Sequence, residues 1–468
     1  MTELSDCLQL AATEVTRFRT SLAERPVAAS IDLDVLRERF DTGLSSEPTP
    51  ASRVVQELID AADPGVVATA GPRFFGFVTG GALPAASAAD MLAVGWDQCA
   101  FNASLSPAAT VVEEVVGRWL KSLLTIPDTA SVGFVTGAQE ANTVALAAAR
   151  HRVLSEVGWD VERDGVHGAP PIRVVASVER HATIDRSLRL LGLGTASLAE
   201  VKADANGAID VRDLGEVLAT GPGGPTIVCL QSGNVNTGAC DDLREATRVA
   251  HGRGAWVHVD GAFGLWAGVA PSRRHLVAGV EAADSWASDA HKWLNVPYDS
   301  GLVFCSRPDV HTAAVSYTAA YLVGSGGAVA GRSDFTLASS RRARGFAVWA
   351  ALRELGRHGV ADLVERNCRL ASRFADALRA DGAEIANDVV VNQVLVSFGD
   401  DATTDRVIAA IQRDGTCWMG GTSWRGRRYM RISVSNYATT ELDVDRSVEA
   451  ILRLASMERA MGAVGSGP

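Results

Sequence analysis

Residues Ser288–Gly301 read SDAHKWLNVPYDSG, and the lysine inside this stretch decides how the whole chain is interpreted. Lys292 follows a segment of apolar and small residues, where a solvated charge is not expected. Arginine replaces lysine almost everywhere else, and only Lys121 and Lys202 share its residue type. Lys121 lies in an amphipathic helical pattern and Lys202 in a polar turn, so we expect both on the solvated surface. Lys292 is therefore the candidate for a reactive amine.

Short apolar segments flank this stretch on both sides and alternate with helical patterns. The expected strands are Ser131–Val135, Arg173–Ser177, Thr226–Gln231, Ala255–Asp260, Ser285–Ser288 and Gly301–Cys305. The expected helices are Gln139–Leu154, Ile184–Leu191, Leu243–Arg253 and a long helix at about Arg342–Gly356. Alternation of this kind predicts an α/β fold whose mostly parallel sheet is covered by helices on both faces.

We expect the chain to divide into three parts. Residues 1–65 predict an N-terminal helical arm, residues 66–360 a large domain, and residues 361–460 a smaller α+β C-terminal domain. The glycine-rich stretch VGSGGAVAG at Val323–Gly331 is too flexible for a regular element, so it predicts a mobile loop.

Composition and patterning argue against several classes of function. The net charge of −11 argues against a nucleic-acid surface. Met1–Thr20 lacks a basic segment followed by an apolar run, and no apolar stretch is long enough for a transmembrane helix. The seven cysteines are scattered singly, which indicates neither a zinc site nor a disulfide framework. We therefore expect a cytoplasmic protein without a metal centre.

Three further features carry chemistry, although each has an ordinary structural explanation. Asp260 ends the strand AWVHVD, where its carboxylate can pair with a protonated ring nitrogen or merely cap the next turn. Thr136–Asn142 (TGAQEAN) opens a helix whose first N–H groups favour phosphate, yet many such turns bind nothing. His181 follows another strand, where an imidazole can stack on a ring, but a lone histidine is more often a satisfied surface or core residue.

The positions of these features agree with one another. All of them lie at the carboxyl ends of predicted strands, where ligands bind in open α/β sheets. The order of phosphate turn, stacking histidine, aspartate and lysine resembles the group II amino-acid decarboxylases that depend on pyridoxal 5′-phosphate (PLP). The resemblance runs from about Pro72 to Ala455, and HVDGAFG (His258–Gly264) and SDAHKWLNVPYDSG are its most specific stretches.

The resemblance implies both a fold and a chemistry. The fold is that of the aspartate aminotransferase-like PLP enzymes (fold type I), with a seven-stranded sheet in the large domain. Lys292 is the residue that forms a Schiff base with the cofactor, and Asp260 pairs with the pyridinium nitrogen. His181 stacks above the ring and Ala262 packs below it. The implied reaction is loss of the α-carboxylate of an L-amino acid.

The same resemblance assigns the contacts of the cofactor phosphate. Ala138 and Gln139, next to Gly137 in the turn, contact the phosphate through backbone and side chain, with His291 close by. Asn234, in QSGNVNTGACD, stands where many members of the family have threonine. Both side chains can form hydrogen bonds, so we expect the cofactor contact to be kept.

Family members are homodimers whose active sites take residues from both subunits. The resemblance makes Phe74 and Phe75, in GPRFFGF, part of the substrate-pocket wall. Cys99 and Phe101 are the wall residues that the partner subunit is expected to contribute. Together with Tyr298, these aromatic residues permit an aromatic or other bulky apolar substrate side chain.

One departure from the family pattern concerns the product. In these decarboxylases a tyrosine of the mobile loop returns a proton to the substrate carbon after CO2 leaves. Here the corresponding residue is Phe335 in one register and Arg332 in another, and neither register supplies a tyrosine. Without that donor, O2 can react instead and give an aldehyde, ammonia and hydrogen peroxide. Tyr317 or Tyr321, just upstream, is the alternative donor.

Four hypotheses therefore remain open. The first is decarboxylation coupled to oxidative deamination, and the second is simple decarboxylation to an amine. The third is another PLP reaction, such as β-elimination from a sulfur amino acid. The fourth is a PLP-binding protein without catalysis, against which the joint presence of Lys292, Asp260 and His181 argues. A nicotinamide dehydrogenase is poorly supported, because residues 192–194 (GLG) lack the third glycine and the downstream acid of that motif.

Overall fold

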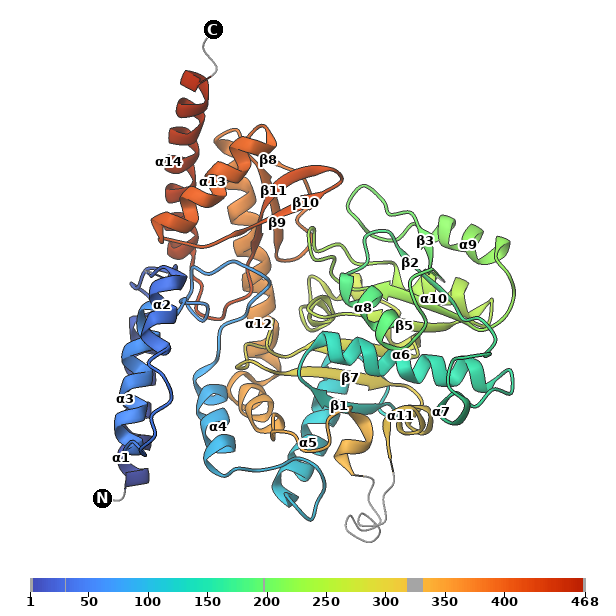
Figure 1. Ribbon diagram of the computed structural model, residues 1–468. Coiled ribbons are helices and arrows are strands. Elements are labelled where there is room, and N and C mark those ends of the chain that lie inside the picture. The colour runs from blue at the N-terminus through green and yellow to red at the C-terminus, as the bar shows by residue number, and fades with distance from the viewer. Residues whose placement is uncertain (1–2, 30, 197, 318–330, 466–468) are drawn as a thin grey trace.

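The computed structural model describes residues 3–29, 31–196, 198–317 and 331–465, and its strands form a large and a small sheet (Figure 1). The large sheet has the strand order β1-β7-β6-β5-β4-β2-β3. β7 runs antiparallel to its neighbours β1 and β6, and every other pair of neighbours is parallel. The strands are β1 (Ser131–Val135), β2 (Arg173–Ser177), β3 (Leu198–Val201), β4 (Thr226–Gln231), β5 (Trp256–Asp260), β6 (Ser285–Asp289) and β7 (Gly301–Cys305).

These strands confirm the predicted α/β fold with its mostly parallel seven-stranded sheet. Every predicted strand is present with nearly the expected bounds, because its apolar residues are buried on both faces of the sheet. β3 was not predicted. It is a short strand at the edge of the sheet, and only one of its four residues is buried, so its sequence carries little apolar pattern.

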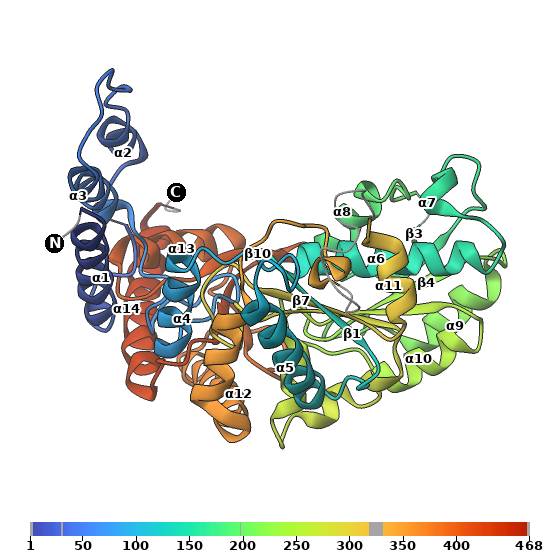
Figure 2. The same ribbon diagram turned by 90° about the horizontal axis from the view of Figure 1, so that it is seen from below.

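Helices cover both faces of the large sheet (Figure 2). One face carries α6 (Ala138–Ser155), α7 (Val161–Asp164), α8 (Ala182–Leu190) and α11 (Pro308–Val315). The other carries α5 (Pro107–Leu124), α9 (Val211–Thr220) and α10 (Leu243–His251). α6 packs against β5, β6 and β7, and its many alanines allow it to lie close to the sheet. The N-terminus of α6 lies at the carboxyl end of β1.

The small sheet is antiparallel, with the order β10-β11-β9-β8. It consists of β8 (Glu384–Ile385), β9 (Gln393–Ser397), β10 (Gly420–Trp424) and β11 (Arg427–Ser433). Its strands β9 and β11 share one apolar core with α13 (Asp401–Asp414) and α14 (Glu441–Gly465). α12 (Gly345–Ala380) leads from the large sheet to the small one. The predicted helix that ends at Gly356 corresponds to the first part of α12. Gly356 has φ = 61°, a left-handed conformation that glycine adopts easily, so the chain kinks there and continues as helix.

The N-terminal arm contains α1 (Glu3–Ser21), α2 (Leu33–Phe40) and α3 (Ala51–Ala62), and α4 (Pro84–Gly95) follows it. Figure 1 shows the arm at one end of the molecule, beyond the small sheet, with the large sheet at the other end. None of the described residues of α1, α2 and α3 is buried. These helices therefore leave apolar side chains such as Leu4, Leu8 and Leu58 exposed on this chain.

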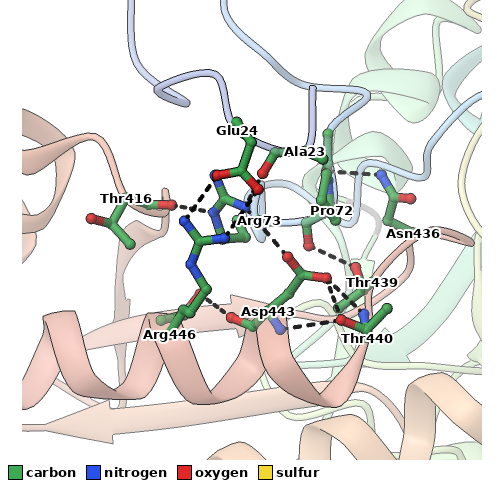
Figure 3. Close-up of polar contacts among 12 residues, drawn as sticks. Ala23, Glu24, Pro72, Arg73, Thr416, Asn436, Thr439, Thr440, Asp443 and Arg446 are labelled. Carbon is green, nitrogen blue, oxygen red and sulfur yellow. Dashed lines mark hydrogen bonds and ion pairs between the residues drawn. The ribbon is translucent and has the colours of Figure 1, made fainter. Parts of the chain in front are cut away.

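A buried arginine ties the arm to the small-sheet region (Figure 3). Arg73 donates from Nη1 to the carbonyl oxygen of Ala23 at 2.6 Å and from Nε to that of Thr416 at 2.7 Å. Its Nη1 also lies 3.4 Å from Oδ1 of Asp443, whose Oδ2 accepts from the Thr440 hydroxyl at 2.6 Å. We call these five residues the Arg73 cluster. Three distant chain segments thus meet on one guanidinium group.

Two expectations about the surface have different outcomes. Lys202 is exposed and pairs with Asp213 at 3.0 Å, as predicted. Lys121 is buried, which corrects the prediction of a solvated residue: its Nζ donates to the backbone oxygens of Asp128 and Ala130. Burial lowers the pKa of the Lys121 ammonium group. The segment after α5 folds back over the lysine, and a helical pattern cannot reveal such a contact.

The described residues contain no helix that is long and apolar enough to span a membrane. Of the predicted mobile loop Val323–Gly331, all but Gly331 lies outside the described residues, as does Tyr321.

Candidate active site

A cavity of about 240 Å³ opens at the carboxyl ends of the parallel strands of the large sheet. Its walls include every residue that the sequence predicts for cofactor binding except Asn234. The walls also include residues that were not predicted, namely Thr183, Gln231, Gly233, Val235, Phe263 and Asp289. Residues from five separate chain segments therefore meet where the strand ends of an α/β sheet place ligands.

Lys292 approaches the cavity from the turn that follows β6. Its Nζ lies 2.9 Å from Oδ2 of Asp289, the last residue of that strand. The chain passes Lys292 closely on its other side, because a Cβ added to Gly80 would lie only 1.9 Å from the Lys292 carbonyl oxygen. The backbone around Lys292 is thus tightly enclosed, while its amine reaches the cavity wall.

Asp260 enters the cavity from the end of the neighbouring strand β5. Its Oδ2 accepts from the side-chain amide of Asn142 at 3.1 Å and from the Thr183 hydroxyl at 3.4 Å. Its Oδ1 accepts from the backbone N–H of Ala262 at 3.3 Å. Three donors thus hold the carboxylate of a residue that is only 5% exposed.

A chain of buried hydrogen bonds stands behind Asp260. The side-chain oxygen Oδ1 of Asn142 lies 2.9 Å from Nε2 of His258, and Nδ1 of His258 lies 3.0 Å from the Ser285 hydroxyl. The Trp256 indole N–H donates to the same hydroxyl oxygen at 3.0 Å. Burial lowers the pKa of His258 to about 4, so the imidazole is neutral at pH 7. We assign its proton to Nε2, where it can donate to Asn142, with Nδ1 accepting from Ser285.

His181 caps the start of α8 and lies on the cavity wall. Its Nδ1 accepts from the backbone N–H of Thr183 at 3.3 Å and lies 2.9 Å from the Thr183 hydroxyl. Burial lowers the pKa of His181, which favours the neutral imidazole. Because Nδ1 acts as an acceptor, the proton of the neutral ring belongs on Nε2.

The predicted phosphate turn forms the start of α6. The Ala138 N–H donates to Oδ1 of Asp289 at 2.6 Å. A Cβ added to Gly137 would lie 3.2 Å from Cε1 of His291, so a side chain there would crowd the cavity. The Gln139 amide nitrogen is directed away from the turn and lies 3.1 Å from the Ser187 hydroxyl of α8. The backbone of the turn thus borders the cavity, whereas the amide of Gln139 is used to hold α8.

His291 lines the cavity, and Tyr298, a predicted pocket residue that does not line it, packs against His291. Their ring centroids are 4.4 Å apart, and Nδ1 of His291 accepts from the Ser300 N–H at 3.0 Å. Burial lowers the pKa of His291 and raises that of Tyr298. The Tyr298 hydroxyl donates to Oγ1 of Thr79 at 3.4 Å, so it remains a protonated phenol close to the lysine turn.

Three predicted site residues lie away from this cavity. The Phe74 ring stacks on Trp418 at 4.9 Å, and the Phe75 ring meets Phe374 edge-on at 5.0 Å, so both belong to the small-sheet side. Asn234 donates to the backbone oxygen of Glu179 at 3.1 Å and accepts backbone N–H groups of the following turn. Its amide is therefore occupied within the protein.

The remaining predicted residues lie side by side outside the cavity. Cys99 pairs with Arg342 in a single β-bridge, and the Phe101 carbonyl oxygen accepts from the Ser333 N–H at 3.3 Å. Phe335 is 9% exposed, and its ring lies 5.3 Å from that of His311. The alternative position, Arg332, pairs with Glu114 at 2.8 Å. Within this single chain, Phe335 therefore does not line the cavity.

The cavity has the groups that PLP requires. Lys292 would supply an amine for the aldehyde, and Asp260 would supply a carboxylate for the pyridine nitrogen. The start of α6 supplies backbone N–H groups, and Gly137 leaves the room that a Cβ would fill. His181 and Ala262, which are predicted to lie above and below the ring, both line the space. No group of side chains suited to a metal ion occurs among the described residues, and PLP needs none.

Sequence reasoning did not single out Asn142, Thr183, His258 and Asp289. Asn142 follows Ala138 by four residues on α6, and Asp289 precedes Lys292 by three residues, so both lie close in sequence to a residue that was singled out. The contact between Asn142 and Asp260 joins residues that are 118 positions apart, and only the folded sheet brings them together.

Comparisons with known proteins agree with this geometry. A family model for the pyridoxal-dependent decarboxylase conserved domain matches residues 34–399. Tryptophan decarboxylase 1 of Oryza sativa subsp. japonica is 27% identical over 472 residues, which cover 93% of this chain and 90% of that protein. The 4-hydroxyphenylacetaldehyde synthase of Rhodiola rosea is 26% identical over 473 residues, which cover 95% of this chain and 93% of that protein.

The fold has close counterparts among solved structures. A crystal structure of Oryza sativa TDC with PLP and tryptamine matches with a TM-score of 0.89 and 25% sequence identity, covering 97% of this chain and 98% of that chain. The structure of mouse CSAD matches with a TM-score of 0.88 at 22% identity, covering 97% and 98%, and so supports the fold alone.

Proposed function

The chain belongs to the pyridoxal-dependent decarboxylase family, and we propose that it removes the α-carboxylate of an L-amino acid with PLP bound to Lys292 as a Schiff base. It is a PLP-dependent amino-acid decarboxylase by family. The observation that carries the assignment of Lys292 is its place in the same cavity as Asp260. Asp260 ends the neighbouring strand and accepts a hydrogen bond from Asn142.

Each residue of the cavity has a distinct task in this proposal. When bound, PLP supplies an electron sink for the electrons left by the departing CO2. Asp260 keeps the ring nitrogen protonated, and Asn142 holds the carboxylate in place. His181 remains neutral, so it covers one face of the ring without adding a charge. The start of α6 receives the phosphate.

The finer proposal is that the product is an aldehyde. The support is the missing tyrosine: Phe335 cannot donate a proton, and Arg332 is committed to Glu114. When the substrate carbon is not protonated, O2 takes up the electrons. One amino acid, one O2 and one H2O then give one aldehyde, one CO2, one NH3 and one H2O2. The relatives include a 4-hydroxyphenylacetaldehyde synthase as well as tryptophan decarboxylases.

An amine is the second candidate product, and one observation favours it. The Tyr298 ring packs on that of His291, in the turn that carries Lys292, and its hydroxyl donates to Thr79. A tyrosine phenol keeps its proton at neutral pH. Tyr298 therefore joins Tyr317 and Tyr321 as an alternative proton donor.

Product analysis decides between these candidates. The PLP-loaded protein is incubated with single L-amino acids, aromatic ones first, in air and without O2. CO2, amine, aldehyde, ammonia and peroxide are quantified for the wild type, Phe335→Tyr, Arg332→Tyr and Tyr298→Phe. We expect equimolar aldehyde, CO2 and peroxide in air, loss of all three without O2, and more amine from Phe335→Tyr or Arg332→Tyr.

Amine without peroxide from the wild type would overturn the oxidative proposal, and a loss of that amine in Tyr298→Phe would assign the donor. Absence of CO2 from every amino acid tested would contradict the decarboxylase assignment of this chain. Pyruvate and sulfide from a sulfur amino acid would instead support β-elimination.

The protein is proposed to act as a homodimer. The support is the arm, whose apolar side chains Leu4, Leu8 and Leu58 are all more than half exposed. A second copy would cover these side chains and bring Cys99 and Phe101 to the neighbouring site. Light scattering should show a dimer for the wild type and a monomer for Leu8→Glu combined with Leu58→Glu. Val157→Glu, an exposed apolar position at the end of α6, is the control and should remain dimeric.

A further inference from the structure

Asp289 has a position that decarboxylation does not by itself explain. It ends β6 and is only 2% exposed. The Asp289 N–H donates to the Ala262 carbonyl oxygen at 2.9 Å, and the Asp289 carbonyl oxygen accepts from the Trp266 indole N–H at 3.1 Å. The sheet and these two bonds fix its backbone, so the direction of the carboxylate is set by the fold.

The Asp289 carboxylate holds two parts of the cavity at once. Oδ2 lies 2.9 Å from Nζ of Lys292, and Oδ1 accepts from the Ala138 N–H at 2.6 Å. Nε2 of His291 lies 3.5 Å from Oδ1. The acid therefore neutralises the reactive lysine and also caps the positive end of α6.

The N-terminus of α6 is also the predicted binding site of the cofactor phosphate. A Cβ added to Gly137 would lie 3.4 Å from Oδ1 of Asp289, so the carboxylate is in contact with the predicted phosphate turn. A phosphate at this turn and the Asp289 carboxylate carry charges of the same sign, and both require the Ala138 N–H. Two such anions within a few ångströms repel each other strongly where water is excluded.

We propose that Asp289 is an internal competitor of the cofactor phosphate. Its carboxylate caps α6 and pairs with Lys292. When a phosphate-bearing ligand binds, Asp289 must give up the Ala138 N–H, and this lowers the affinity of the cavity for that ligand. The proposal rests on the proposed function, because it requires the start of α6 to receive the phosphate of PLP.

Paired titrations test this proposal without measuring activity. Dissociation constants are determined by absorbance for PLP and for pyridoxal, which has no phosphate, with the wild type and Asp289→Asn. We expect the ratio of the pyridoxal constant to the PLP constant to increase about tenfold in Asp289→Asn. The altered pairing of Lys292 affects both ligands alike and cancels in the ratio. Inorganic phosphate should also compete with PLP at a lower concentration in this variant.

Two further variants serve as matched comparisons. Glu140→Gln removes another carboxylate at the start of α6, but one bound to Thr136 and not to Ala138. We expect it to change the ratio by less than threefold. Asp289→Ser should shift the ratio in the same direction as Asp289→Asn, and it provides the test if the asparagine variant does not fold.

An unchanged or smaller ratio in folded Asp289→Asn or Asp289→Ser would overturn the proposal, and so would an equal increase in Glu140→Gln. Failure of the proposed function gives a different result. In that case Lys292→Ala would show the same PLP absorbance change and the same PLP affinity as the wild type, whatever residue occupies position 289.

Discussion

The segment Arg73–Gly80 connects two buried polar clusters that have different roles. At its start, the Arg73 guanidinium is enclosed by two carbonyl oxygens and the Asp443 carboxylate (Figure 3). At its end, Gly80 lies against Lys292, whose amine and partner Asp289 border a cavity of about 240 Å³. Both clusters are buried and charged. Only the second leaves polar atoms facing open space, and that difference separates a binding site from a structural anchor.

The aromatic pair that the sequence assigns to the substrate pocket lies on the Arg73 side of this segment. Phe74 and Phe75 follow Arg73 directly, and their rings pack on Trp418 and Phe374. They belong to the side of the segment that anchors the small sheet. The structure therefore predicts that changes around Arg73 affect stability, while changes around Lys292 affect the chemistry.

The largest expected effect is that of Lys292→Ala. We expect decarboxylation to fall by at least about 1,000-fold, because the covalent bond to the cofactor is lost. The melting temperature of the cofactor-free protein should change by only a few degrees, since the lysine borders a cavity. CO2 release and calorimetry measure the two quantities. Lys202→Ala, which removes an exposed lysine, should leave both unchanged.

Arg73→Met tests the other cluster. Removing the guanidinium leaves the buried Asp443 carboxylate and two carbonyl oxygens without their donor, and such losses cost about 3–5 kcal/mol of unfolding free energy. Urea unfolding of the cofactor-free protein measures this change. Arg446→Ala, which removes an exposed ion pair with Glu24, should cost at most about 1 kcal/mol. Equal effects of the two variants would contradict the anchoring role of Arg73.

The buried histidine behind the cavity predicts a pH dependence. The pKa of His258 is about 4 in the folded chain, against about 6.5 for an unperturbed histidine. Between these values the unfolded chain binds a proton that the folded chain does not, so stability decreases as pH falls from 6.5 to 4. The shift corresponds to about 3 kcal/mol. His258→Gln should make the unfolding free energy less dependent on pH in this window, and a slope equal to that of the wild type would contradict the assignment.

Asn142→Ala should have the smallest effect of these variants. It removes one donor to Asp260 and the acceptor of His258, which is expected to weaken PLP binding about tenfold. Absorbance titration with PLP measures the change. Asn367→Ala, at a buried asparagine of α12, is the control and should alter stability without altering PLP affinity. The reverse pattern would show that Asn142 serves only the packing of α6.

Sequence reasoning succeeded where a signal was local. The large strands carry continuous apolar runs because both of their faces are buried, so their positions followed directly from the sequence. The ends of those strands then indicated Lys292, Asp260 and His181 as neighbours across one edge of the sheet. Edge strand β3 has no such run and was missed.

The remainder depended on contacts that a helix or strand makes with another part of the chain. Lys121 reads as a surface residue on its helix, yet the chain after α5 covers it. The roles of Asn142 and Asp289 become visible only when α6 is placed against β5 and β6. No pattern within one element specifies such pairs, because their partners lie more than 100 positions away.

The central claim is that Lys292 carries the cofactor, and one measurement tests it most directly. The PLP-loaded protein is treated with borohydride, which converts a Schiff base into a stable amine, and its peptides are mapped by mass spectrometry. The account predicts the pyridoxyl mass on the peptide that contains Lys292, with none on Lys121 or Lys202. A label on Lys202, or decarboxylation by a protein in which Lys292 remains unlabelled, would contradict it.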